Sequence, residues 1–153
     1  MRGIAVSPLI YFHGGYSELR QRRRHRIWLE TCWRCFASGR VLKSVHYYFV
    51  SRETIVDLHA RFLAEEVPTD ILTFDYGESA EIFISPVVVR MNASLYGVSF
   101  SEELRRVLVH GLLHLLGLDD HTESQCAAMR AAEEFCLKEW QKIVSHETQR
   151  QRL

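Results

Sequence analysis

The stretch HGLLHLLGLDDH, residues 110–121, constrains the fold more than any other part of this 153-residue chain. His110 and His114 are four residues apart in a leucine-rich run, so on an α-helix both rings lie on one face and can reach one ion. Gly117 is expected to end that helix. Asp120 and His121 then follow where a third ligand can turn back toward the first two. The segment therefore predicts one buried helix that carries metal ligands.

The pattern predicts three protein ligands and one open position, which is typical of catalytic zinc. His110 and His114 supply two ligands, and the third is Asp120 or His121. The zincin motif H-x-x-x-H-x-x-G-x-x-H places its last ligand three residues after the glycine, a register that favours Asp120. Imidazole is the more usual zinc donor, so His121 stays open as the alternative. A histidine that packs in the hydrophobic core would account for one of the two residues, but the complete pattern favours a metal-binding site.

The residue after the first histidine is Gly111. Metallopeptidases of the H-E-x-x-H type carry there the glutamate that activates the zinc-bound water. A small zinc peptidase is therefore the weaker interpretation, and the sequence leaves the general base and every other catalytic residue unassigned. Zn²⁺ is the expected cofactor, although other divalent metals share these donors.

Charge limits the possible partners. Lys+Arg and Asp+Glu both number 19, so the formal net charge is zero and any binding of nucleic acid must use a local patch. The main patch is an arginine run made of Arg20, Arg22, Arg23, Arg24 and Arg26. A solvated helix face and a contact with RNA phosphates both remain open for it.

The sequence also indicates a compartment. No apolar stretch approaches the roughly 18 residues of a membrane span, and the N-terminus does not have the features of a signal peptide. Four cysteines are compatible with free thiols in a reducing cytoplasm. Cys32 and Cys35 form a C-x-x-C pair late in an amphipathic segment, where both are expected to pack in the core and not to act in redox chemistry.

Hydrophobic periodicity predicts a single α+β domain with about four strands in a mixed sheet and about five helices, one of them the zincin-like metal helix. The domain is expected to span residues 1–145, followed by a frayed polar tail, 146–153. Expected strands are 4–12, 45–50, 70–74 and 81–85; expected helices are 17–38, 51–64, 86–96, one that follows Ser99 and carries the histidines, and 124–144.

Several segments together resemble one family. The run from His110 to Gly117 with its acidic loop is similar to the signature of the YbeY family, bacterial metal-dependent endoribonucleases implicated in ribosomal RNA maturation and ribosome quality control. Three upstream blocks also resemble that family: Leu58–Phe62, Val67–Phe74 and Glu81–Ser85. The resemblance covers roughly residues 55–135. It implies a zinc-dependent endoribonuclease whose partners are ribosomal RNA and the ribosome or its proteins, with no membrane association.

The chain departs from the family pattern at two positions. The family commonly has a third histidine where this chain has Asp120. Many members also have an arginine, thought to serve RNA cleavage, where this chain has Leu63. Arg61, two residues earlier, is the candidate substrate-binding residue. Because of Leu63, the alternative function is a metal-stabilised, ribosome-associated RNA-binding protein with little turnover.

Overall fold

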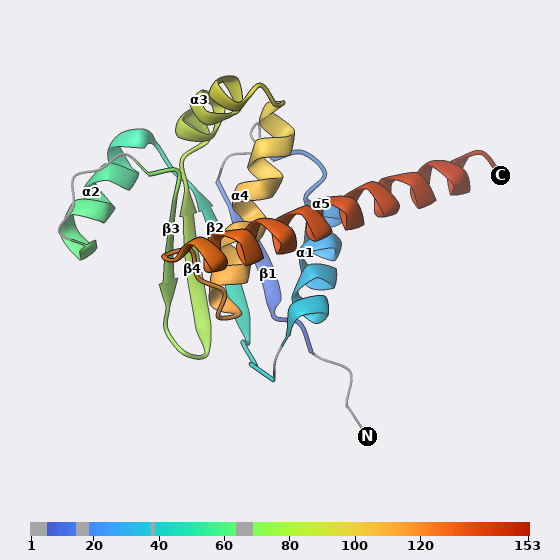
Figure 1. Ribbon diagram of the computed structural model, residues 1–153. Coiled ribbons are helices and arrows are strands. Elements are labelled where there is room, and N and C mark those ends of the chain that lie inside the picture. Colours follow the sequence, from blue (N-terminus) through green and yellow to red (C-terminus); the bar gives the residue numbers. More distant parts are fainter. Residues whose placement is uncertain (1–5, 15–18, 38, 64–68) are drawn as a thin grey trace.

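Four strands and five helices form the part of the chain that the computed structural model describes, residues 6–14, 19–37, 39–63 and 69–153 (Figure 1). The order is β1 (Leu9–His13), α1 (Arg22–Phe36), β2 (Ser44–Phe49), α2 (Arg52–Leu63), β3 (Ile71–Asp75), β4 (Ser79–Ile84), α3 (Pro86–Tyr96), α4 (Phe100–Leu115) and α5 (Glu123–Gln151). The α+β class with a mixed four-stranded sheet is confirmed, whereas the reading of α4 as a metal helix stays a prediction.

The strands form one sheet in the order β1-β2-β4-β3. β1, β2 and β4 run parallel, and β3 pairs antiparallel with β4 at an edge. Side chains alternate between the faces of each strand. Phe12, Tyr47 and Ile82 are in register across three strands and are at most 8% exposed. This register places one apolar face against the helices.

Helix α4 is the central element of the helical layer. It contacts α1, α3 and α5 as well as β3 and β4. Nine of its residues are buried, from Glu103 to Leu115, so only a narrow strip of its surface is free for polar groups. The Tyr47 hydroxyl donates a hydrogen bond of 2.8 Å to the Leu108 carbonyl, which ties α4 to the middle of the sheet. The helix that carries both histidines is thereby held in place from several sides.

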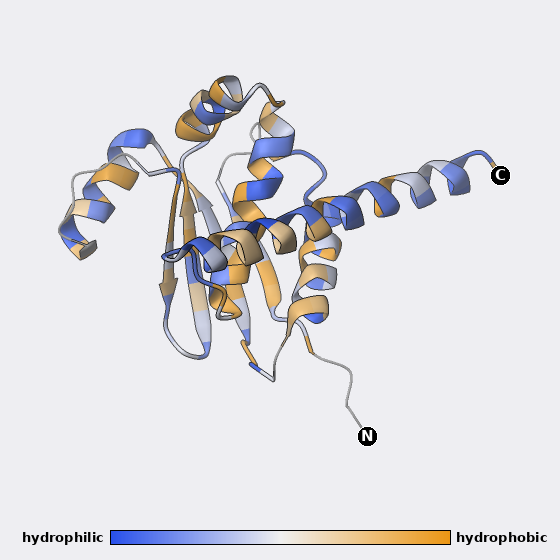
Figure 2. Ribbon diagram, in the orientation of Figure 1, coloured by the Kyte–Doolittle hydropathy of each residue, from blue (hydrophilic) through white to orange (hydrophobic). Residues whose placement is uncertain are grey.

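Helices α1 and α5 complete the core. Trp28 and Trp33 of α1 are fully buried, and the Trp28 indole donates to the Cys136 carbonyl of α5 over 2.6 Å. The apolar colours of Figure 2 follow the strands and the helical surfaces that meet in this layer, while the second half of α5 is largely hydrophilic. No helix among the described residues is long and apolar enough to cross a membrane.

Helix ends follow local sequence signals. Ser99 caps α4, because its side chain accepts a hydrogen bond from the Glu102 backbone N–H. At the start of α2, the Ser51 side chain accepts from the Thr54 backbone N–H. Ser85 caps α3, whose first residue is Pro86, as expected at that position.

Some predicted boundaries differ from those observed. β4 begins two residues before the expected position, at Ser79, and α5 continues to Gln151 instead of fraying after residue 144. The extra helical turns contain no glycine or proline, and Arg24 of α1 forms an ion pair with Glu147 there. Residues 6–8 and 19–21, expected in the first strand and the first helix, lie outside both elements, which begin at Leu9 and Arg22. Residues 4, 17, 38 and 64, where expected elements start or end, lie outside the described residues.

The prediction that both cysteines of the C-x-x-C pair are core residues is wrong for one of them. Cys32 is fully buried, but Cys35 is exposed, because residues three apart on a helix differ by about 60° in direction. Cys136 of α5 lies beside Cys32, and this contact together with burial raises the pKa of the Cys32 thiol. All four cysteines are free thiols.

Candidate metal centre

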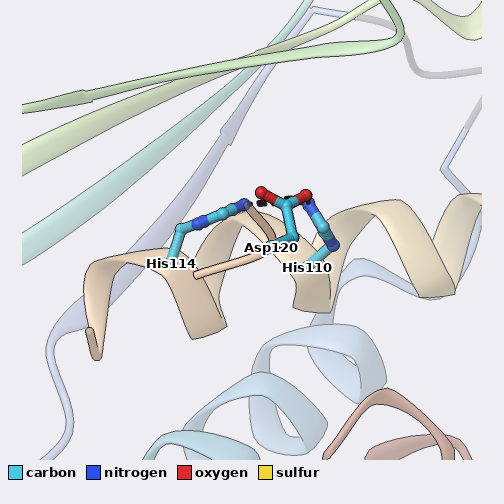
Figure 3. A group of neighbouring side chains, drawn as sticks. All are labelled: His110, His114 and Asp120. Atoms are coloured by element: carbon cyan, nitrogen blue, oxygen red, sulfur yellow. Dashed lines mark hydrogen bonds and ion pairs between the residues drawn. The ribbon is translucent and has the colours of Figure 1, made fainter. Parts of the chain in front are cut away.

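The two histidines of α4 meet at the side of the helix that faces the β3 edge of the sheet. Their Nε2 atoms are 2.9 Å apart, as the four-residue spacing predicts (Figure 3). Both rings are about one quarter exposed, 23% for His110 and 28% for His114. They are therefore fixed by their surroundings and still open to a ligand.

The loop after α4 brings a carboxylate to this pair. Gly117 has a φ of 97°, a left-handed conformation that glycine adopts without strain, and its N–H caps the His114 carbonyl. The chain then reverses, so that an oxygen of Asp120 lies 3.6 Å from His110 Nε2 and 3.8 Å from His114 Nε2. The Cys126 thiol donates to the Asp120 carbonyl over 3.0 Å and holds the loop against α5.

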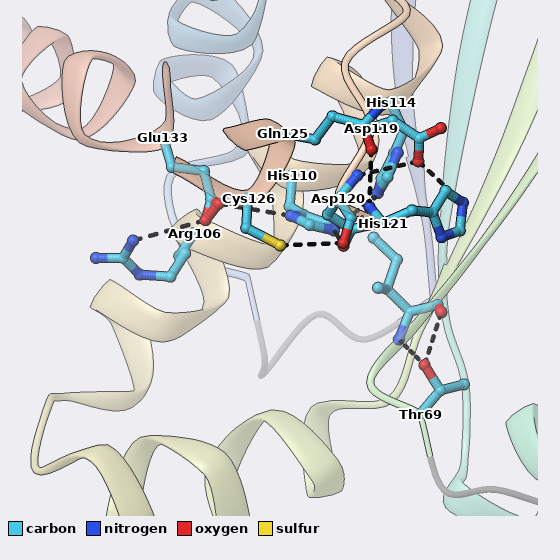
Figure 4. Close-up of polar contacts among 11 residues, drawn as sticks. Thr69, Arg106, His110, His114, Asp119, Asp120, His121, Gln125, Cys126 and Glu133 are labelled. Atoms are coloured by element: carbon cyan, nitrogen blue, oxygen red, sulfur yellow. Dashed lines mark hydrogen bonds and ion pairs between the residues drawn. The ribbon is translucent and has the colours of Figure 1, made fainter. Parts of the chain in front are cut away.

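The start of α5 fixes the other end of the loop. The Gln125 side chain accepts from the backbone N–H group of His121 (Figure 4). It also accepts from the backbone N–H group of Thr122, with which it forms a capping box. The path from Gly117 to Thr122 is thus determined by hydrogen bonds at both ends.

The three donors fit a metal ion. Two atoms bound to one tetrahedral zinc at about 2.0–2.2 Å are roughly 3.3–3.6 Å apart. The observed separations of 2.9, 3.6 and 3.8 Å bracket that range, and the donors of His110, His114 and Asp120 all lie within 4.8 Å of one another. Two imidazoles and one carboxylate are a common donor set for catalytic zinc.

His121, the alternative ligand, has a different neighbourhood. Its side chain is 82% exposed, and its Nε2 lies 3.1 Å from an oxygen of Asp119. Its ligand atom groups with those of Asp119 and Asp120, not with the α4 histidines. The choice of Asp120 over His121 remains a prediction, and this geometry is the argument for it.

A carboxylate on α5 contacts the first histidine from behind. Glu133 is 5% exposed, and one of its oxygens lies 3.5 Å from His110 Nδ1. Arg106 lies 3.6 Å from the other oxygen of Glu133 (Figure 4). Arg106 also lies 2.8 Å from Glu134. Such an outer carboxylate favours the tautomer with the proton on Nδ1, which leaves Nε2 as an acceptor toward the centre.

The pKa values of the two histidines move in opposite directions. Burial lowers the pKa of His110, but the hydrogen bond and charge of Glu133, with Asp120 and Asp70, outweigh it, and the net pKa is raised. Burial and the neighbouring His110 lower the pKa of His114. A neutral imidazole is the form that binds a metal, so the shift at His114 favours binding.

A cleft of about 840 Å³ opens beside the donors. Its described walls come from α2, β3, the end of α4 and the loop, and include four aspartates, four histidines and no lysine or arginine. Asp70 lies in this wall, where the Asn92 side chain donates to it over 3.5 Å. Burial raises the pKa of the Asp70 carboxyl. Aspartates thus outnumber cationic groups in this wall, where Asp75 is paired with Arg40, and this balance favours the approach of a cation.

Arg61 does not line this cleft. It is exposed on α2 and forms an ion pair of 3.2 Å with Asp57. His59 and Phe62 of the same helix line the cleft instead. The assignment of Arg61 to substrate binding stays a prediction, and the side chain of Leu63 lies outside the described residues.

The sequence did not identify Asp70 or Glu133 as site residues. Asp70 belongs to a block that resembles the family, and that block was the only available signal. Glu133 belongs to no motif, because its role depends on how α5 crosses α4. Only the folded chain brings it to His110.

Fold and site define a class of protein: a small α+β domain in which a buried helix and the loop after it present two histidines and an aspartate to an open cleft. Comparison with known proteins makes this specific. Residues 18–141 match the family described as Endoribonuclease YbeY. The chain belongs to this family.

Individual relatives agree with that assignment. The chain is 37% identical to "Endoribonuclease YbeY" of Bacteroides thetaiotaomicron over 65% of its own length and 75% of the relative's. It is 38% identical to the protein of that name from Cytophaga hutchinsonii over 78% and 86%. Among solved structures, the solution structure of TM1509 from Thermotoga maritima matches with a TM-score of 0.59 and 29% identity, covering 88% of this chain and 91% of that one.

Proposed function

We propose that this chain is a metal-dependent endoribonuclease that cleaves ribosomal RNA during its maturation and in ribosome quality control, with Zn²⁺ as its cofactor. The observation that carries the proposal is the cluster of His110, His114 and Asp120 at the wall of an open cleft. Membership of the endoribonuclease family supports RNA as the substrate. The ribosome and its proteins are then the expected partners, and four free cysteines agree with the cytoplasm as the compartment.

His110, His114 and Asp120 would hold the ion. A bound divalent ion polarises a phosphoryl oxygen or lowers the pKa of a bound water toward ~7. Asp70 is our candidate for proton transfer, since it lies in the same cleft and burial raises the pKa of its carboxyl. Glu133 would orient His110 through Nδ1.

A small zinc peptidase is disfavoured by the surroundings of Gly111. A Cβ at this position would lie 2.8 Å from Ile71 Cδ1 and 3.1 Å from Ile82 Cδ1. The position at which a metallopeptidase carries its glutamate is therefore packed against β3 and β4, and that base is missing here.

The test is cleavage of ribosomal RNA fragments by wild-type protein and by His114→Ala purified in the same way. We expect cleavage by the wild type only, and the variant also controls for contaminating ribonucleases. Equal cleavage by both would remove the metal site from the mechanism. Co-sedimentation with ribosomes without cleavage, together with loss of the fold on chelation, would indicate the alternative, a metal-stabilised RNA-binding protein.

Single substitutions separate the two candidates for the third ligand. We expect Asp120→Ala to lose most of its bound zinc, because a direct ligand is removed, and His121→Ala to keep it. Metal content is measured on purified protein by atomic emission, with Asp119→Ala as the matched control from the same loop. Retention of zinc by Asp120→Ala and its loss from His121→Ala would reverse the assignment.

A further inference from the structure

A second cavity, of about 380 Å³, lies at the other end of α4. The segment before α1, α1 itself, α3 and the first turns of α4 line it. Three of the lining residues are arginines, Arg20, Arg90 and Arg105, and no aspartate or glutamate is among them. The cavity therefore concentrates positive charge in a protein whose formal net charge is zero.

Glu102 acts on Arg105 electrostatically, but none of the three arginines forms a close ion pair with a described residue. Among the described residues, no carboxylate lies within 4.0 Å of the guanidinium of Arg20, Arg90 or Arg105. Other members of the arginine run behave differently. Arg24 forms an ion pair with Glu147, and Arg26 donates to the Ile10 carbonyl over 2.8 Å. Much of the run thus stabilises the fold, while Arg20 faces the cavity.

Aromatic rings hold two of the guanidinium groups without removing their charge. Arg90 lies 4.5 Å from the ring centre of Phe100, and Arg105 lies 4.5 Å from that of Trp140. Such stacking restricts the side chain before a ligand arrives, which lowers the entropic cost of binding. Burial lowers the pKa of the neighbouring His25 to about 4, with Arg105 and Arg24 contributing. His25 is thus neutral at pH 7, and the arginines carry the charge of the cavity.

The chemistry of this cavity differs from that of the cleft beside the candidate metal centre. Fixed planar guanidinium groups are suited to phosphate, to which they donate two parallel hydrogen bonds. The described wall of the cleft has four aspartates and no arginine or lysine, and Arg40, which contacts the wall residues Asp75 and Leu115, is already paired with that aspartate. Arg105 and His110 are five residues apart, about 140° around α4, and the two sites face different sides of that helix.

We propose that the cavity lined by Arg20, Arg90 and Arg105 binds a phosphate group of an RNA strand outside the cleft. The inference that this strand is a substrate rests on the proposed ribonuclease function. The phosphate is either the terminal one of an RNA end or an internal one of the backbone, since both offer the same oxygens to the arginines.

Phosphate binding is tested first with inorganic phosphate on the full chain at low ionic strength. We expect backbone amide shifts at Arg20, Ser101 and Arg105 in ¹H–¹⁵N spectra, and their loss in the double variant Arg90→Gln/Arg105→Gln. Arg23→Gln is the matched control, because Arg23 is exposed on α1 and does not line the cavity. Thermal melts identify a folding defect in the double variant, and Arg20→Gln, at an exposed position, provides a second test. Absence of phosphate-dependent shifts in the wild type would overturn the proposal.

RNA binding is then measured by anisotropy in the His114→Ala background. We expect the double variant to bind at least tenfold more weakly and to lower the slope of log K against log salt by about two, with Arg23→Gln unchanged. An oligonucleotide with a 5′-hydroxyl identifies the source: weaker binding than its 5′-phosphorylated form indicates a terminal phosphate, and equal binding an internal one. Equal losses in the double variant and Arg23→Gln would show a diffuse charge effect and overturn the site. Failure of the ribonuclease proposal appears separately, as absent cleavage by wild-type protein.

Discussion

The orientation of single side chains decides the chemistry at the candidate metal centre. His110 has Glu133 on its Nδ1 side and Asp120 on its Nε2 side, so its two nitrogens have different roles. Glu134 is the next residue of α5 and also binds Arg106, but it is exposed and does not reach the histidine. Both adjacent glutamates contact Arg106, and of the two only Glu133 also contacts His110.

Glu133→Gln is expected to weaken zinc binding 10- to 100-fold, because an amide fixes the Nδ1 proton of His110 less well than a carboxylate does. Glu134→Gln should change the zinc affinity less than twofold. The measurement is competition with a chromophoric chelator, combined with ¹⁵N spectra that report the histidine tautomer. Equal zinc affinity and equal tautomer populations in both variants would contradict a positioning role for Glu133.

His25 controls a pH dependence of stability. It lies between Trp28 and Trp140, with its Nδ1 3.0 Å from the Gln21 carbonyl. Burial lowers its pKa from 6.5 to about 4, so the folded state prefers the neutral ring. The contribution of neutral His25 to the free energy of unfolding is therefore expected to be fully present above pH 6.5 and to be lost as the pH falls toward 4, because the unfolded chain takes up the proton first.

Between pH 7.5 and pH 5, we expect the wild type to lose about 2 kcal/mol more unfolding free energy than His25→Gln does. Urea denaturation at the two pH values measures this difference. His146→Gln, at an exposed position of α5, is the control and should follow the wild type. A parallel loss in wild type and His25→Gln would place the titrating group elsewhere.

Among the elements, α4 combines an apolar core helix with a functional strip. Gly111 lowers the helix propensity by about 1 kcal/mol relative to alanine. The position faces Ile71 and Ile82, so glycine here permits close approach of α4 to the sheet. The loop after α4 depends on different signals, Gly117 and the capping box at Thr122, which turn the chain back beneath the histidines.

We expect Gly111→Glu to lower the unfolding free energy by about 3–5 kcal/mol, because it buries a charge without a partner between α4 and the sheet. Gly111→Ala should cost much less, since the gain in helix propensity offsets a shift of the Ile71 side chain. Chemical denaturation measures both variants. A Gly111→Glu protein of normal stability would contradict the packing argument, whereas chelator-sensitive digestion of casein by the wild type would contradict the rejection of a peptidase.

For the whole molecule, the core and the candidate metal centre occupy different places. The largest fully buried side chains belong mainly to α1, the sheet and α4, whereas the donors lie in the wall of an open cleft. The fold therefore has a hydrophobic core that does not include the candidate metal donors. A bound ion would add stability by mass action without being required for folding.

Removal of metal should leave a folded protein. We expect the chelated protein to keep its near-ultraviolet circular dichroism and to melt a few degrees lower, with recovery on addition of zinc. His114→Ala should melt at the same temperature with and without zinc. Unfolding of the chelated wild type would indicate that metal binding supplies folding free energy, as the alternative function requires.

The sequence by itself determined the class of fold and most of the elements. Alternation in the strands, the spacing of apolar residues in the helices and caps such as Ser99 are local signals, and the structure follows them. The spacing of His110 and His114 also predicted that the two rings meet, because a helix fixes the relation of residues four apart.

Only the tertiary structure decided which distant groups join these rings. The approach of Glu133 depends on the crossing of α5 over α4, and the place of Asp70 depends on the position of β3. Arg20, Arg90 and Arg105 are far apart in sequence and share a cavity only because three helices begin or pass there. The physical reason is that helical and strand periodicity act over a few residues, whereas these contacts are set by the packing of whole elements against a common core.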